Sequence, residues 1–364
     1  MVIKNLSATN FRNLDVSGQE LSDGINIFYG NNAQGKTNFL EAIYFCAFGR
    51  SLRVRHDNEL VKWGESSAFI RLDALRSEFF YTIDAGIKCE GRKSKKNILF
   101  DKLPIKHMKE LFGKILVVMF SPEDLRLIKS GPSERRRFMD MEICQLSPVY
   151  YNDLKEYHRT LKQRNVMLKT LQKDKRDKDS LEIWDKQLIK FGQRIIKTRQ
   201  GFINKINIIA KEIHKNITEG KEDLEINYKP GLTLENFETA IKKYHDRDII
   251  RGVTVEGTHT DDIEFLIDGK SAKVFGSQGQ QRTAALSTKM AEIKIIEQNT
   301  SETPVLLLDD VLSELDGTRQ TFLLKQITNM QTLITCTGVE DILTKKLTTN
   351  AKILNVDNGK VRSI

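Results

Sequence analysis

Residues 30–37 constrain this chain more than any other segment. They read Gly-Asn-Asn-Ala-Gln-Gly-Lys-Thr and match the phosphate-binding pattern G-x-x-x-x-G-K-S/T. The preceding residues 25–29 are typical of a short buried strand, and residues 38–45 have the apolar spacing of a helix. Because a strand, a glycine-rich loop and a helix N-terminus direct backbone N–H groups toward one anion, we expect a phosphate site here. Lys36 then reaches the β- and γ-phosphates, and the Thr37 hydroxyl binds Mg²⁺.

Composition places the chain among ordinary globular proteins, with 29% charged and 39% hydrophobic residues among 364. The longest apolar run, residues 115–120, is too short to span a bilayer, and the N-terminus lacks the pattern of a signal peptide. Four scattered cysteines without a C-x-x-C indicate reduced thiols and no zinc site. We therefore expect a cytoplasmic protein with no membrane partner. A net charge of +9 favours a polyanionic partner such as nucleic acid.

The apolar pattern divides the chain into three segments. Residues 1–120 combine the phosphate loop with strand-like segments between 66 and 100, which predict a β-meander. Residues 121–220 change to long helical patterns, and two apolar stripes between 153 and 217 predict an antiparallel helical hairpin. The charged residues 173–179 form its turn. Residues 221–364 return to mixed strand and helix patterns, so the fold class is α/β with an inserted helical arm.

A second motif lies far along the chain from the phosphate loop. Residues 305–308 form an apolar strand that ends in two carboxylates, Asp309 and Asp310. A P-loop ATPase needs such a carboxylate to hold Mg²⁺ beside the phosphates, and we assign that role to Asp309. Asp310 follows as the general base that polarises the attacking water. Whether Ser121 or Glu314 helps to orient that water is left open.

Residues 275–282 contain Ser277 and two glycines at the start of a helix, a second anion-binding arrangement. One chain has no evident need for two γ-phosphate sites. A dimer resolves this, because Ser277 and Gly279 of one subunit then close over the nucleotide bound at Lys36 of the other.

Two basic segments are candidates for contact with DNA. Arg53 and Arg55 lie in a glycine-led loop, which we weigh evenly between a solvated loop and a phosphate contact. Arg135 and Arg136 belong to a run of three arginines in a helix that Ser133 is expected to cap. Consecutive arginines on a helix point in different directions, so we expect only some of them to reach a phosphate.

These motifs carry a family resemblance. Residues 275–280 resemble the signature motif of ABC-type ATPases, and residues 311–316 resemble the D-loop that follows their Walker B strand. Residues 10–13, Asn-Phe-Arg-Asn, and the helical insertion resemble the SMC-like branch. More narrowly, residues 30–38, 120–125, 275–285 and 306–316 resemble the RecF family of bacterial recombination-repair proteins. The motifs follow that family's order and span almost the full length.

The resemblance implies an ABC/SMC-like P-loop ATPase head with a β-meander lobe and a short helical-hairpin arm. It implies an ATP-dependent homodimer that clamps double-stranded or gapped DNA and, with RecO and RecR, helps to load RecA. The implied activity is weak, DNA-stimulated ATP hydrolysis, with Lys36, Asp309 and Asp310 as catalytic residues and Mg²⁺ on Thr37 and Asp309. The residues implied to contact ATP are Arg12, Asn13, Gly30, Asn31, Asn32, Ala33, Gln34, Gly35, Lys36, Thr37, Asn38, Ser277, Gln278, Gly279 and Gln280.

The chain departs from its relatives' patterns at several positions. Thr258 and Thr260 stand where the family usually has Pro and Arg, and residues 334–338 lack the histidine of transporter ATPases. Asp310 replaces the Glu of most ABC-type ATPases and is one methylene shorter, which predicts slow hydrolysis. Two alternative functions fit the sequence less well. An ABC-transporter ATPase subunit disagrees with the missing histidine and the arm, and a P-loop kinase leaves residues 277–280 unexplained.

Overall fold

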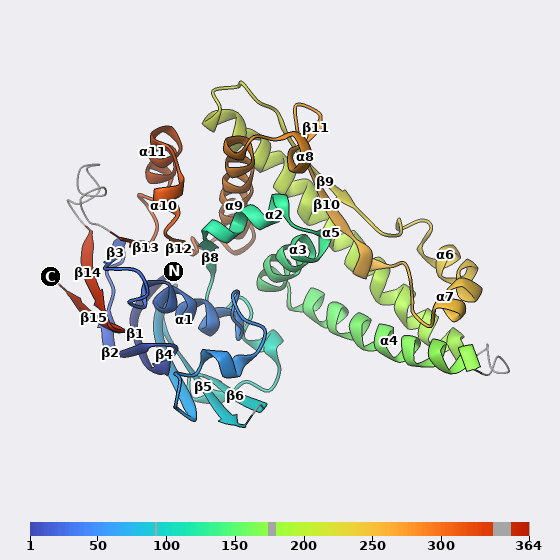
Figure 1. Cartoon of the computed structure of the whole chain (residues 1–364), viewed down its shortest axis with the longest axis horizontal. Coiled ribbons are helices and arrows are strands. Elements are labelled where there is room, and N and C mark those ends of the chain that lie inside the picture. Colours follow the sequence, from blue (N-terminus) through green and yellow to red (C-terminus); the bar gives the residue numbers. More distant parts are fainter. Residues whose placement is uncertain (92, 174–179, 338–350, 364) are drawn as a thin grey trace. The chain divides into compact units, whose positions relative to one another are not determined.

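A computed structural model describes residues 1–91, 93–173, 180–337 and 351–363 of the chain (Figure 1). It contains two compact units, Met1–Asp124 with Glu292–Ile364, and Leu125–Ala291. The division differs from the expected one because residues 221–291 belong with the helical arm. The physical reason is that strand β9 (Leu224–Lys229) pairs with β10 (Asp262–Ile267) and packs on the arm's second helix. Most of the charged turn at 173–179 lies outside the described residues.

The first unit is built on a sheet with the strand order β15-β14-β3-β13-β12-β8. All but the terminal strand β15 run parallel. Parallel strands end at a common edge of their sheet, so the residues that follow β3 and β12 meet there. The strands are β3 (Ile25–Tyr29), β8 (Val117–Phe120), β12 (Val305–Asp309), β13 (Thr332–Cys336), β14 (Lys352–Asp357) and β15 (Lys360–Ser363).

A second, antiparallel sheet of this unit has the order β2-β1-β4-β5-β6-β7 and contains the predicted meander. Burial alternates along β4, which indicates that one of its faces is covered. Helix α1 (Lys36–Phe48) packs against strands of both sheets and is buried on nearly all sides. The strands are β1 (Val2–Phe11), β2 (Leu14–Glu20), β4 (Ser67–Arg76), β5 (Phe79–Glu90), β6 (Lys93–Phe100) and β7 (Leu103–Pro104).

Short helices complete the first unit. The helix α10 (Val311–Glu314) directly follows the carboxylates at the end of β12, and α11 (Gly317–Gln326) begins three residues later. The side chain of Asp316 caps α11 by accepting a hydrogen bond from the Arg319 amide at 3.0 Å. The 3₁₀ helices are η1 (Asp57–Leu60), η2 (Met108–Glu110) and η3 (Pro122–Leu125), the last of which reaches the unit boundary.

The second unit contains the predicted helical hairpin, formed by α4 (Pro148–Lys173) and α5 (Leu181–Ile217), which lie side by side (Figure 1). Buried ion pairs join this hairpin to the segments around it. The Arg164 guanidinium of α4 is fully buried and lies 2.7 Å from both Asp185 and Asp248. Such a buried pair depends on each partner, because loss of one leaves an uncompensated charge.

The remaining elements of the second unit surround the hairpin. A small sheet with the order β11-β10-β9 packs against α5. Helix α9 runs on past Ala291 into the first unit. The other bounds are α2 (Arg126–Lys129), α3 (Pro132–Leu146), α6 (Phe237–Lys243), α7 (His245–Arg251), η5 (Thr258–Thr260), β11 (Lys270–Ser271), α8 (Ala272–Phe275) and α9 (Gln278–Thr300).

Helix α3 begins differently from the prediction. Gly131 is its N-cap and Pro132 its first residue, so Ser133 lies inside the helix and does not cap it. Proline is favoured at this position because its missing N–H has no partner in a first turn anyway.

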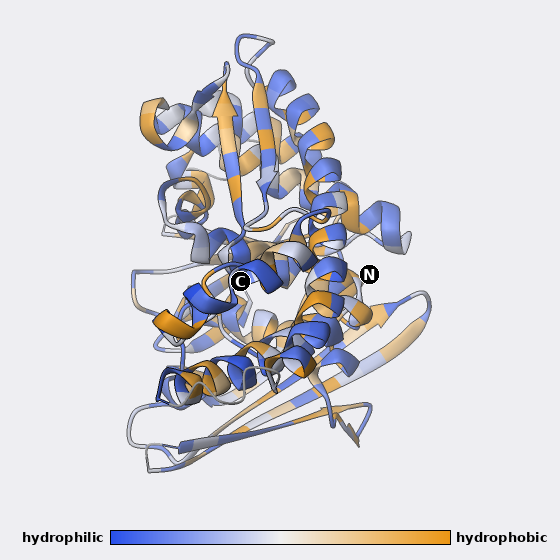
Figure 2. Ribbon diagram, turned by 90° about the vertical axis from the view of Figure 1, so that its right-hand side faces the viewer, coloured by the Kyte–Doolittle hydropathy of each residue, from blue (hydrophilic) through white to orange (hydrophobic). Residues whose placement is uncertain are grey.

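Hydrophilic and hydrophobic residues alternate along the helices of the chain (Figure 2). Within the described ranges, none of these helices combines the length and the apolar character that crossing a bilayer requires.

Candidate functional site

The loop after β3 has the backbone conformation that its glycines permit. Gly30 and Gly35 have φ angles of 153° and 115°. A Cβ atom on Gly30 would lie 2.3 Å from the Val356 carbonyl oxygen, so no larger residue fits. The hairpin of β14 and β15 also holds the loop through Gln34. The Gly359 amide donates to the Gln34 carbonyl at 2.8 Å, and the Asn358 amide donates to the side-chain oxygen of Gln34 at 2.7 Å.

The side chain of Lys36 turns back over this loop. Its ammonium donates hydrogen bonds to the carbonyl oxygens of Gly30 at 2.6 Å and Asn31 at 2.9 Å, and the residue is only 7% exposed. The charge therefore lies at the loop that the sequence predicts to bind phosphate. A lysine in this place acts as a point charge toward a polyphosphate.

Three side chains meet at the carboxyl edge of the parallel sheet. The Thr37 hydroxyl donates to Asp309 Oδ1 at 2.8 Å, and the Thr335 hydroxyl donates to the same oxygen at 2.9 Å. Asp309 is 8% exposed, and burial raises the pKa of its carboxyl, while the hydrogen bonds from Thr37 and Thr335 oppose that rise. Thr37 and Asp309, which the sequence analysis assigns to one Mg²⁺ site, are thus in direct contact although they are far apart in the sequence.

Thr335 is a site residue that the sequence reasoning missed. Its hydroxyl oxygen also accepts a hydrogen bond from the Asp310 amide at 2.9 Å. The strand order places β13 between β12 and β3, so its last residues face both motifs. Threonine near the end of an apolar strand was the available signal, but the sequence alone does not say which strand lies beside β12.

The donors at this edge fit a magnesium ion. The Thr37 hydroxyl and the Asp309 carboxylate are hard oxygen ligands of the kind that Mg²⁺ prefers. In the described part of the chain, no cluster of three or more His, Cys, Asp or Glu residues is placed to hold a metal. At a nucleotide site Mg²⁺ takes few protein ligands, and its other ligands are water and phosphate.

Asp310 occupies the next position and has a left-handed backbone conformation, with φ of 55°. Non-glycine residues adopt this conformation at a cost, and such strain is found disproportionately at functional sites. The Ser313 hydroxyl donates to the Asp310 carbonyl at 2.7 Å, which helps to hold the turn into α10. Asp310 lines the cavity at the site, whereas Ser121 and Glu314 are not among the described residues that line it.

The cavity has a volume of about 690 Å³, within the range of small-molecule sites. Arg12 and Asn13, which the resemblance implies as nucleotide contacts, are among the residues that line it. Arg12 is held by a two-point ion pair with Glu41, at 3.0 and 3.1 Å, and Asn13 donates to the Ala33 carbonyl at 3.2 Å. The cavity is lined by Arg12, Asn13, Asn32, Ala33, Gln34, Gly35, Lys36, Thr37, Asn38, Arg53, Glu59, Val61, Lys62, Trp63, Asp310 and Thr335.

The candidate DNA contacts lie in different environments. Arg53 lines the cavity and donates to the Asn38 side chain at 3.1 Å, which favours a role at the nucleotide. Arg55 is exposed in the same loop, so its predicted contact with DNA stays a prediction.

Arg135 is buried, so the prediction that it contacts DNA is wrong. It is 5% exposed, and its guanidinium makes a two-point ion pair with Asp262, at 2.6 and 2.9 Å, and donates to the Ser130 carbonyl. Its side chain joins α3 to β10 and does not reach solvent, so its role is structural. Arg136 is partly buried and donates to the Asp261 carbonyl at 2.7 Å.

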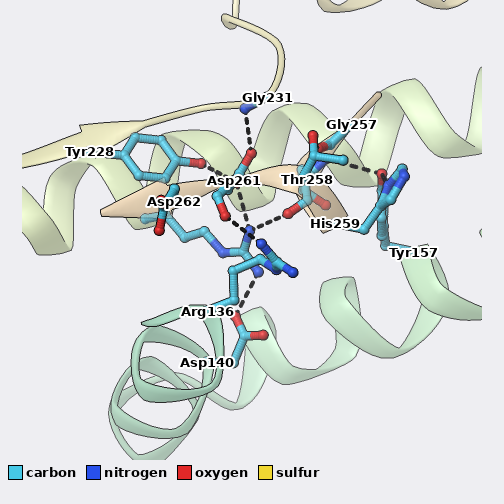
Figure 3. Close-up of polar contacts among 12 residues, drawn as sticks. Arg136, Asp140, Tyr157, Tyr228, Gly231, Gly257, Thr258, His259, Asp261 and Asp262 are labelled. Atoms are coloured by element: carbon cyan, nitrogen blue, oxygen red, sulfur yellow. Dashed lines mark hydrogen bonds and ion pairs between the residues drawn. The ribbon is translucent and has the colours of Figure 1, made fainter. Parts of the chain in front are cut away.

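The region that departs from the family pattern forms a polar cluster in the second unit. Figure 3 shows Tyr228 and Gly231 directed at Asp261, with Tyr157 beside His259. The buried Arg199 of α5 lies 2.6 Å from Asp261, and burial raises the pKa of that carboxyl against the opposing effect of Arg199. Two arginines reach the backbone of residues 257–261, Arg136 from α3 and Arg199 from α5. The Thr260 hydroxyl donates a local hydrogen bond to the Gly257 carbonyl at 2.8 Å.

The signature-like segment forms a capping box at the start of α9. The Gln280 amide donates to the Ser277 hydroxyl at 3.2 Å, and the Ser277 amide donates to the Gln280 side-chain oxygen at 2.9 Å. Ser277 and Gln278 are exposed, and Gly279 lies in the first turn. The motif therefore presents a helix N-terminus, with its partial positive charge, at the surface of the second unit.

Comparison with known proteins places these features in one family, although no family model matches the chain. The DNA replication and repair protein RecF of Lachnoclostridium phytofermentans is 46% identical over 361 residues, which is 99% of each protein. RecF of Lachnospira eligens is 44% identical over 363 residues, again 99% of each. Two solved structures of the recombination mediator protein RecF in the RecFOR pathway, with ATP and with ATPrS, have TM-scores of 0.91 and 0.90. They are 36% and 35% identical to this chain and cover all of it, over 97% and 98% of their own lengths.

More distant structures share the fold. An SMC head bound to the winged-helix domain of ScpA has a TM-score of 0.56 at 16% identity, covering 100% of this chain and 98% of its own. The predicted ABC/SMC-like head is thus confirmed. The chain belongs to the RecF family of DNA replication and repair proteins.

Proposed function

We propose that this cytoplasmic protein binds ATP with Mg²⁺ and uses ATP to form a homodimer that clamps duplex or gapped DNA. The observation that carries the proposal is the contact between the Thr37 hydroxyl and Asp309 Oδ1 at 2.8 Å. It joins the phosphate loop to the carboxylate motif across 272 residues of sequence. The two RecF structures with ATP and ATPrS support the choice of nucleotide.

The residues of the site divide the work of binding and hydrolysis. Lys36 and the loop amides bind the phosphates, and the dipole of α1 adds favourable charge at the same place. Thr37 and Asp309 would hold Mg²⁺, and the ion would supply positive charge beside the phosphates. Asp310 positions the attacking water and accepts its proton. Because its side chain is shorter than that of Glu, we expect hydrolysis to be slow, with a turnover number below the ~10 s⁻¹ of a median enzyme.

The second half of the site comes from a second copy of the chain. In the dimer that we propose, Ser277 and Gly279 of one subunit contact the γ-phosphate held at Lys36 of the other. The exposed N-terminus of α9 supports this role because it can accept an anion. ATP therefore acts as a switch that closes the dimer, and hydrolysis opens it. RecR, acting with RecO, is the proposed protein partner through which the clamp helps to load RecA.

The test is fluorescence anisotropy of a labelled gapped duplex with the Asp310→Asn protein at near-physiological salt. Because this variant retains the phosphate loop and loses the base, ATP should tighten its DNA binding and the complex should persist. The matched control is Lys36→Ala, which should bind DNA no better with ATP than without. DNA binding by Asp310→Asn that is indifferent to ATP would exclude the clamp and leave an ATPase with another partner.

A further inference from the structure

Trp63 stands out on the surface of the first unit. It is 101% exposed, yet it is one of only two tryptophans in the chain and lines the cavity described above. An indole left in water forgoes a large hydrophobic stabilisation, since aromatic side chains contribute most when buried. A fully exposed indole at the mouth of a polar site therefore suits a planar ligand.

The local sequence explains how this side chain is presented. Residues 62–65 form a turn in which the Glu65 amide donates to the Lys62 carbonyl at 3.0 Å. Gly64, the third residue of the turn, has φ of 89°, the conformation that a type II turn requires there and that glycine adopts without strain. Trp63 is thus the second residue of a tight turn, where the side chain points away from the chain.

The turn is fixed to the end of β1, directly before Arg12 and Asn13, which line the same cavity. Val61 forms a bridge with Phe11, and the Lys62 amide donates to the Asn10 carbonyl at 2.8 Å. On the other side, the Arg12 amide donates to the Leu60 carbonyl at 2.6 Å. Trp63 is therefore held at a defined place relative to Arg12, and ordering it on a ligand costs little backbone entropy.

We propose that Trp63 is the surface on which the base of the bound nucleotide stacks. The cavity has a phosphate end, formed by residues 32–38, and a second group of lining residues at 59–63. Its volume of about 690 Å³ exceeds what a triphosphate alone needs and accommodates a nucleoside as well. This inference rests on the proposed function, because it concerns the same nucleotide.

Stacking on an aromatic face contributes to affinity without selecting strongly among bases, because every base presents a π face. We therefore assign Trp63 to affinity for the nucleoside part of the ligand. Lys36 and the loop amides supply the affinity for its phosphates. The two contributions are separable, since one requires a base and the other does not.

The test compares the binding of Mg²⁺-ATP with that of Mg²⁺-tripolyphosphate, which has the phosphates and no base, by calorimetry. Trp63→Ala should weaken ATP binding by roughly 5- to 100-fold, the range expected for the loss of one stacked aromatic ring. Its tripolyphosphate affinity should equal that of the unmodified protein. Because the side chain is fully exposed, its removal leaves no cavity in the core, and the variant should fold normally.

Two variants serve as matched controls. Trp63→Phe keeps a ring at the turn and should recover most of the ATP affinity. Phe80→Ala removes another exposed aromatic side chain of the same unit, 72% exposed on β5 and outside the cavity lining, and should change nothing.

The alternative outcomes separate this inference from the proposed function. Unchanged ATP affinity in Trp63→Ala, with tripolyphosphate still bound, would overturn the stacking role alone. Equal losses of ATP and tripolyphosphate affinity would make Trp63 a structural residue of the loop and overturn it as well. A protein that binds neither ligand would overturn the proposed function, and this inference with it.

Fluorescence gives an independent readout. In a Trp184→Phe background, Trp63 is the only tryptophan. Its emission should be quenched by ATP and be insensitive to tripolyphosphate, because only the base reaches the indole. Equal responses to both ligands would contradict the proposal.

Discussion

Thr335 connects the two acidic residues of the site through a single hydroxyl group. It donates to Asp309 Oδ1 at 2.9 Å and accepts from the Asp310 amide at 2.9 Å. Its side chain therefore fixes the direction of one carboxylate and the backbone of the other, whose left-handed conformation needs such support.

We predict that Thr335→Val keeps the shape of the side chain but lowers the turnover number for ATP about tenfold, because a misplaced base transfers protons poorly. ATP affinity should change little, since Lys36 and the loop are untouched. The variant should also lose about 1–3 kcal/mol of stability, because the Asp310 amide is left without its partner. Steady-state hydrolysis and urea unfolding measure the two effects. Thr335→Ser, which restores the hydroxyl, is the control. A fully active Thr335→Val would show that Asp310 is positioned without it.

His259 supplies a pH dependence in the second unit. Its Nε2 donates to the Thr254 carbonyl at 3.1 Å, so the neutral ring accepts the Tyr157 hydroxyl at Nδ1, 3.0 Å away (Figure 3). Burial lowers the pKa of His259 below its usual 6.5 and raises the pKa of Tyr157 to about 12, so Tyr157 keeps the proton that it donates. A proton added to Nδ1 would break this hydrogen bond.

The unfolded chain therefore takes up a proton at His259 at higher pH than the folded chain does. Its stabilising contribution is complete above pH 6.5 and decreases as the pH falls toward the lowered folded pKa. Between pH 7.5 and 5.5, the free energy of unfolding should therefore fall by up to about 1.4 kcal/mol less in His259→Gln than in the unmodified protein. Urea unfolding followed by Trp184 fluorescence in a Trp63→Phe background reports on the second unit, because Trp184 lies on α5. An identical pH dependence in the variant would show that His259 does not titrate in this window. His158, whose pKa burial also lowers, is the residue to test next.

Among the elements, the N-terminus of α9 shows how much of an anion site can be predicted from the sequence. The serine and the two glycines of residues 276–279 predicted a helix start that binds an anion. The structure adds that Ser277 and Gln280 already satisfy each other's amides in a capping box. In the dimer that we propose, the Ser277 hydroxyl must turn from the Gln280 amide toward a phosphate.

We predict that Ser277→Arg binds ATP normally and does not dimerise with ATP, because a long cationic side chain at the helix start blocks the facing subunit. Multi-angle light scattering with and without ATP measures the dimer, and nucleotide calorimetry measures binding. Ser277→Thr keeps a capping hydroxyl and is the control that should still dimerise. Dimerisation of Ser277→Arg with ATP would refute the composite site.

In helix α3, the sequence did not distinguish a buried arginine from an accessible one. Arg135 and Arg136 look equivalent in the sequence, but their side chains leave the helix about 100° apart. Arg135 points inward to Asp262 and Arg136 lies near the surface of the unit. Only the packing of α3 against β10 decides which arginine is buried, and that packing is not encoded in local spacing.

At the scale of the whole molecule, the motifs and the strands and helices that carry them could be predicted because each element follows from local patterns. The phosphate loop has its strand and helix, and the apolar run of β12 ends at its carboxylates. Thr335 and Trp63 could not be predicted, because their roles depend on which strands are neighbours and how a turn is attached to β1. The unit boundary also depends on tertiary pairing, since β9 and β10 pair with each other and β9 packs on α5 of the arm.

The composite site makes a prediction that only two chains together can test. Lys36→Ala disables the phosphate loop of its own subunit, and Ser277→Arg disables the facing helix start. In a mixed dimer, one site carries both defects and the other is intact, because it combines the Lys36 of one variant with the Ser277 of the other.

Each variant alone should be inactive, whereas an equimolar mixture should recover ATP hydrolysis and ATP-dependent binding to gapped DNA. Neither variant should pair with itself, so the dimers that form with ATP are mixed, and each has one working site of two; we therefore expect up to about half of the unmodified activity. A mixture as inactive as its components would mean that each subunit completes its site alone. In that case ATP would act within one chain, and the dimer could not be the ATP-driven clamp.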